Sequence, residues 1–128
     1  MINGTHILLY STDAEADRAF FRDVLHLKSV DSGGGWLIFG LPPAELAVHP
    51  GDGAFVQSHA GIRMMGALVY FMCDDVRKVV ETLAAQGIAC TPVQEAEWGI
   101  ATSVPLPSGG WIGLYQPTHP TALSLQTT

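Results

Sequence analysis

The chain has 128 residues, of which 48% are hydrophobic and only 14% are charged. This length predicts one domain that can bury a core, and the low charge predicts much covered or partnered surface. The net charge of −6 argues against nucleic acid or an anionic membrane as a partner.

Neither an apolar run long enough to span a membrane nor a signal-peptide pattern occurs in the sequence. The two cysteines, Cys73 and Cys90, form no disulfide framework. A cytoplasmic protein with reduced thiols is therefore expected.

The first half begins with a predicted strand over residues 5–10, whose alternate side chains face opposite sides. A capping-box pattern at residues 12–15 then predicts a helix to about residue 25, with one apolar stripe for packing on a sheet. Three further strands are predicted at 27–30, 36–39 and 44–49.

The second half repeats this order after a connector at residues 51–66, which is rich in glycine and has no sustained periodicity. An apolar strand leads into a helix capped by Asp74 or Asp75, and Gly87 is a suitable residue to end that helix. The other strands are predicted at 88–91, 100–106 and 111–115, before a weakly patterned polar tail at 118–128.

Both halves therefore read as βαβββ modules, at residues 5–50 and 67–117 of one domain. Trp36 and Trp98 begin equivalent strands of the two modules, and structural roles are expected for both. Because each helix covers only one face of its strands, the other faces must be buried elsewhere or enclose a cavity. The predicted fold class is α+β, with the two modules forming a cupped mixed sheet.

This pattern resembles the vicinal oxygen chelate superfamily, which includes glyoxalase I, extradiol dioxygenases, fosfomycin-resistance thiol transferases and bleomycin-resistance proteins. The resemblance covers residues 5–117 and rests on three stretches: HILLYSTDAEADRAFFRDVL, VYFMCDDVRKVVETLAAQG and WGIATSVPLPSGGWIGLYQP. It implies paired βαβββ modules, a small-molecule ligand and a homodimer, with the connector near the interface.

Metal-using members of that superfamily hold a divalent ion with side chains from the first and last strands of each half. By this resemblance, His6 and Glu45 match two ligand positions, whereas Leu68 and Gly113 stand where the second half usually supplies the others. Two protein ligands are too few for a tight site. A tightly held metal cofactor is therefore not expected, although His6 and Glu45 remain candidate ligands for a divalent ion.

Alternation along neighbouring strands also predicts which side chains line the cavity. Most of them are aromatic or polar, as is typical of a small-molecule pocket, and Glu45 is the candidate catalytic residue among them. The predicted ligand-binding residues are His6, Tyr10, Glu45, His49, Tyr70, Met72, Trp111 and Tyr115.

Two functions remain open at this point. The first is a glyoxalase-like protein that binds a small organic molecule in the manner of bleomycin-resistance proteins and without a tight metal. The alternative is a metal-dependent lyase, isomerase or extradiol-type dioxygenase that uses His6 and Glu45, in which the ion polarises substrate oxygens.

Overall fold

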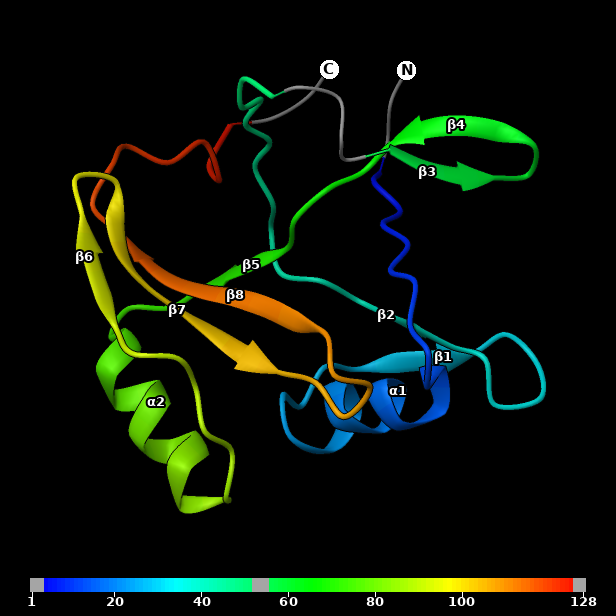
Figure 1. The fold of residues 1–128 in the computed structure, drawn as a ribbon, viewed down its shortest axis with the longest axis horizontal. Helices are drawn as coiled ribbons and strands as arrows, with labels where there is room; N and C mark the ends of the chain where they lie inside the picture. Colours follow the sequence, from blue (N-terminus) through cyan, green and yellow to red (C-terminus); the bar gives the residue numbers. More distant parts are fainter. Residues whose placement is uncertain (1–3, 52–55, 126–128) are drawn as a thin grey trace.

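The computed structural model describes residues 4–51 and 56–125, and within them it is an α+β fold of two helices and eight strands (Figure 1). The first half contains helix α1 (Ala14–Asp23) and a hairpin of β1 (Ser29–Asp31) and β2 (Leu37–Phe39). A second hairpin pairs β3 (Val56–His59) with β4 (Ile62–Met65). The second half comprises β5 (Tyr70–Met72), α2 (Val76–Ala85), β6 (Gln94–Ala96), β7 (Gly99–Pro105) and β8 (Trp111–Pro117).

The second half forms a four-stranded sheet with the strand order β5-β8-β7-β6. Strand β5 runs parallel to β8, whereas the β8–β7 and β7–β6 pairs are antiparallel. Helix α2 lies across one face of this sheet (Figure 1). This half therefore has the predicted βαβββ order.

The core lies between the helices and that face of the sheet. Val76 and Val104 are almost completely buried, with exposed fractions of 0% and 1%. Alternation along β7 and β8 brings their inward residues onto α2. The other buried residues of this core are Phe20, Leu83, Ile112 and Leu114.

Side-chain caps begin both helices, but the cap of α1 is Asp13 and not Thr12, the N-cap of the predicted capping box. The carboxylate of Asp13 accepts from the Ala16 amide, and that of Asp75 accepts from the Lys78 amide. Gly87 has a φ of +80° and its amide donates to the Ala84 carbonyl, 3.0 Å away, so it ends α2 at low steric cost.

A buried carboxylate joins the two halves. Asp17 of α1 is only 6% exposed. It accepts from the Ser11 hydroxyl at 2.7 Å, and from the amide and hydroxyl of Ser108 at 3.0 and 2.7 Å. Ser108 belongs to the turn between β7 and β8, so these bonds hold α1 against that turn.

Several predicted strands differ from the structure. Among the residues that the structure describes, 5–10 and 44–49 belong to no paired strand. A ladder needs a second backbone alongside, which a strand-like sequence does not supply. The predicted strand at 88–91 is also wrong, since β6 pairs with β7 in its place.

The connector contains a hairpin that the sequence analysis did not predict. A two-residue turn at Ala60 and Gly61, with φ values of +51° and +77°, joins β3 to β4. Positive φ at both positions is the backbone that two-residue hairpins prefer. The turn could not be predicted from the sequence, because alanine, the residue at position 60, seldom adopts a positive φ.

Candidate functional site

The face of the sheet turned away from α2 carries the aromatic side chains of the candidate site. Along β8, Ile112 and Leu114 belong to the core, so Trp111, Gly113 and Tyr115 lie on the opposite face. The parallel register places Tyr70 of β5 beside Gly113 and Met72 beside Tyr115. Four of the predicted ligand-binding residues thus share this open face with Gly113: Tyr70, Met72, Trp111 and Tyr115.

Three rings gather on that face and form an aromatic cluster of Tyr70, Trp98 and Tyr115. Their centroids are 6.3 Å apart for Tyr70–Trp98, 5.6 Å for Tyr70–Tyr115 and 5.6 Å for Trp98–Tyr115, all in edge-to-face contact. Such contacts add to the packing energy of aromatic rings. Tyr115 is buried, whereas Tyr70 and Trp98 are each 46% exposed.

Two glycines make room for these rings. A Cβ atom on Gly113 would lie only 2.1 Å from Cδ1 of Tyr70, so the Tyr70 ring occupies the space above this glycine. A Cβ on Gly99 would lie 3.0 Å from Cδ2 of Tyr115 and 2.7 Å from the Gln116 carbonyl oxygen. The absence of side chains at both positions is therefore part of how the cluster is built.

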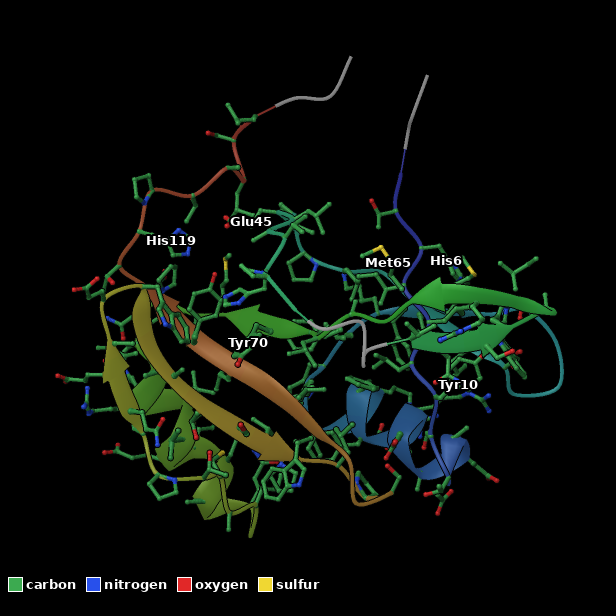
Figure 2. The ribbon with its side chains drawn as sticks, turned by 45° about the horizontal axis from the view of Figure 1, so that its top comes forward. His6, Tyr10, Glu45, Met65, Tyr70 and His119 are labelled. Carbon is green, nitrogen blue, oxygen red and sulfur yellow. The ribbon has the colours of Figure 1, made fainter. Side chains whose placement is uncertain are left out.

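Polar groups border the cluster at Tyr115. Its hydroxyl lies 3.1 Å from Nε2 of His119, whose ring stacks on the Tyr115 ring. Glu45 accepts from the Ala122 amide at 3.2 Å, which brings its carboxylate to the same end of the molecule (Figure 2). Burial and the nearby Glu45 carboxylate raise the pKa of the Tyr115 hydroxyl above its usual value.

The remaining predicted residues lie elsewhere in the single chain. The Tyr10 hydroxyl bonds Nδ1 of His59 in the β3–β4 hairpin, and Figure 2 shows His6 and Tyr10 near that hairpin, away from Glu45 and His119. His49 is exposed on an unpaired segment. The expected neighbouring strands that would bring His6 beside Glu45 do not form within one chain.

Sequence reasoning missed two members of the site. Trp98 was expected to have a structural role, but its ring is half-exposed in the aromatic cluster. His119 was placed in the weakly patterned tail, although it stacks on Tyr115. The four-residue separation between Tyr115 and His119 gave no signal, because the chain leaves β8 between them.

The donor set does not fit a divalent metal. Across residues 4–51 and 56–125, no three His, Cys, Asp or Glu side chains come close enough to share an ion. Leu68 offers no donor, and the space above Gly113 is filled by a phenol ring. The thiols do not compensate, since burial raises the pKa of both Cys73 and Cys90 and keeps them protonated.

An apolar cavity of about 180 Å³ lies on the other side of the sheet. It is bordered by Leu25 and Leu27 after α1, by Val79 and Leu83 of α2, and by residues of β5, β7 and β8 that include Met72 and Gly113. Because no charged side chain lines it, it has no group to orient a polar ligand. We therefore place the candidate site on the open face.

Comparison with known proteins relates this architecture to solved structures. TnmS3, an antibiotic binding protein from Streptomyces sp. CB03234, superposes with a TM-score of 0.60 at 20% identity, over 92% of this chain and 100% of that one. Lactoylglutathione lyase from Agrobacterium tumefaciens gives 0.60 at 20% identity, over 89% and 92% of the two chains. The fosfomycin resistance protein FosX from Listeria monocytogenes gives 0.57 at 17% identity, over 92% and 96%.

The fold is that of the glyoxalase/bleomycin resistance protein/dioxygenase superfamily. A member of that superfamily from Sphaerobacter thermophilus also matches, with a TM-score of 0.56 and 20% identity over 90% of this chain and 98% of its own. At these identities the superpositions show a shared fold and nothing about activity. No protein-family model and no curated protein matches the sequence significantly.

Neither helix that the structure describes has the length and apolar character needed to cross a bilayer.

Proposed function

We propose that this protein binds a small organic molecule on the open face of its sheet, as a homodimer and without a tightly held metal. The observation that carries the proposal is the aromatic cluster: two half-exposed rings and one buried ring, bordered by a carboxylate and an imidazole. Aromatic surfaces with a few convergent polar groups are typical of small-molecule sites.

The antibiotic binding protein TnmS3 shares the fold, and this likeness supports a binding role. It does not by itself assign a ligand, since one fold hosts many functions. Tyr70, Trp98, Tyr115, Glu45 and His119 are the residues that we place in the site, with His6, Tyr10, His49 and Trp111 as further candidates from the sequence.

A second copy of the chain would cover apolar side chains and a sheet edge that one chain leaves exposed. Leu46 and Val48 are 91% and 82% exposed on an unpaired segment, and Met65 of β4 is 87% exposed. Large apolar side chains exposed to this extent are expected to be covered by a partner. In the same molecule, strand β5 is an edge with no outer neighbour among the described residues.

An unpaired segment and an unpaired sheet edge in one chain are complementary in a symmetric dimer, where each copy satisfies the other. Residues 5–10 and 44–49 of one copy would then lie against the open sheet of its partner. This arrangement would bring His6 and Tyr10 of one copy toward the aromatic cluster of the other and enclose the site.

The test begins with elemental analysis of protein purified without a metal-chelating tag. We expect far less than one metal ion per chain, because only His6 and Glu45 offer donors at the superfamily's ligand positions. Binding of an aromatic compound, followed by tryptophan fluorescence, should be unchanged by EDTA. Titration with Mn²⁺, Fe²⁺, Ni²⁺ and Zn²⁺ should leave that affinity unaltered.

Stoichiometric metal in the wild-type protein would overturn this proposal if Glu45→Gln and His6→Ala each abolished it. Loss of metal and of turnover in the same variants would establish the metal-dependent enzyme in its place. A dimer that binds no metal and no aromatic compound would also contradict the binding function.

A further inference from the structure

A ligand bound at the aromatic cluster would contact its two exposed rings. Tyr70 and Trp98 stand edge to face, with an interplanar angle of 81°, and both are half-exposed. Their ring faces carry the negative part of the aromatic quadrupole. Organic cations are attracted to ring faces of this kind.

Fixed charge near the cluster is negative. The carboxylate of Glu45, which accepts from the Ala122 amide, adds to the effect of burial in raising the pKa of the Tyr115 hydroxyl. The chain contains no lysine or arginine after Lys78, and none in residues 29–62. Strands β5, β7 and β8, the segment that bears Glu45 and the tail that bears His119 therefore contribute no permanent cation.

His119 does not need a positive charge to make its contacts. Its Nδ1 lies 2.8 Å from the Pro120 carbonyl oxygen, which can only accept, so Nδ1 carries the proton. Its Nε2 can then accept from the Tyr115 hydroxyl. The neutral imidazole satisfies both hydrogen bonds, so neither bond requires a positive charge on His119.

From these observations we infer that the site selects an aromatic cation, such as a heteroaromatic ring with a fixed positive nitrogen, over neutral and anionic molecules of the same shape. This inference rests on the proposed binding function and specifies its ligand class. A phosphonate or carboxylate ligand would find no guanidinium or ammonium group on these elements, whereas a cation finds ring faces and a carboxylate.

Three probes of similar shape test the inference: N-methylquinolinium, its neutral isostere 1-methylnaphthalene, and the anion 1-naphthoate. Dissociation constants are measured by NMR titration of the dimer. We expect the cation to bind at least about tenfold more tightly than the neutral isostere, a difference of roughly 1.4 kcal/mol. The anion should bind most weakly, and added salt should weaken only the cation's binding.

Variants assign the preference to its residues. Glu45→Gln should reduce cation affinity about tenfold and leave 1-methylnaphthalene unaffected, because the amide oxygen can still accept from Ala122. Trp98→Leu should weaken both probes by removing a ring face. Trp36→Leu is the matched control: Trp36 begins the equivalent stretch of the first half, where it packs under Arg18, and its loss should change neither affinity.

The outcomes separate the two proposals. Equal affinity for the cation and 1-methylnaphthalene would overturn the charge preference and leave the binding function standing. Equal weakening of both probes by Glu45→Gln would likewise overturn it, since Glu45 would then act only on the structure of the site. Failure of all three probes to bind would overturn the binding function together with the inference.

Discussion

At the scale of single residues, Asp17 shows how one buried carboxylate fixes the relation of two distant segments. Its oxygens accept three hydrogen bonds from Ser11 and Ser108, so the charge is compensated although the side chain is 6% exposed. A buried charge without such partners would be strongly destabilising. Helix α1 is thereby held to the β7–β8 turn by polar contacts.

We expect Asp17→Asn to lower the free energy of unfolding by about 1–3 kcal/mol, because an amide nitrogen cannot accept from a serine donor. Urea denaturation followed by circular dichroism measures this change. Glu81→Gln, at an exposed position of α2, is the control and should leave stability nearly unchanged. Equal midpoints for Asp17→Asn and wild type would contradict this role for Asp17.

At the scale of elements, strands β5 and β8 depend on a glycine. Gly113 lies in the middle of β8, where glycine ordinarily weakens a strand by roughly 0.5–1 kcal/mol relative to alanine. The Tyr70 ring above it reverses that preference, because an added Cβ would overlap the ring. The position is thus decided by packing and not by strand propensity.

Gly113→Ala should therefore destabilise the protein by about 1–3 kcal/mol and change the near-ultraviolet circular dichroism of the aromatic cluster. Gly40→Ala is the control, since its nearest contact would be the Lys28 carbonyl at 3.9 Å. In a double-mutant cycle, Tyr70→Ala should remove most of the penalty of Gly113→Ala. Additive effects of the two substitutions would show that they do not interact.

At the scale of the whole molecule, the apolar surface left open in one chain points to a partner copy. Segment 44–49 exposes Leu46 by 91% and Val48 by 82%, and β4 exposes Met65 by 87%. The low charged fraction of 14% gives few groups with which to keep such a surface in water. The exposure is explained if a second copy covers these side chains.

Sedimentation equilibrium at micromolar concentration should accordingly show a dimer. Leu46→Asp should raise its dissociation constant at least tenfold, because about 1.5–3 kcal/mol of apolar burial is lost and a charge is buried. Leu125→Asp tests an equally apolar residue that is 75% exposed in the tail and should leave the dimer intact. A wild-type monomer throughout this range would overturn the assembly proposal.

The sequence by itself determined the features that depend on local chemistry. The start of each helix was located to within one residue, at the capping-box pattern of residues 12–15 and at Asp74 or Asp75. The end of α2 at Gly87 was also predicted, because backbone groups at a helix end need partners within one turn. The alternation along β8, which separates Ile112 and Leu114 from Tyr115, follows from the two-residue repeat of any strand. The α+β class and the second βαβββ half were predictable for the same reason.

Only the tertiary structure decided which strands find partners and which side chains meet. Residues 5–10 and 44–49 have strand-like sequences but pair with no strand among the described residues, because a ladder is a property of two segments and not of one. Trp98 and His119 joined Tyr115 through contacts that no spacing encodes. The sequence does not show what lies above Gly113. In the fold the Tyr70 ring occupies that space, because close packing depends on atoms far apart along the chain.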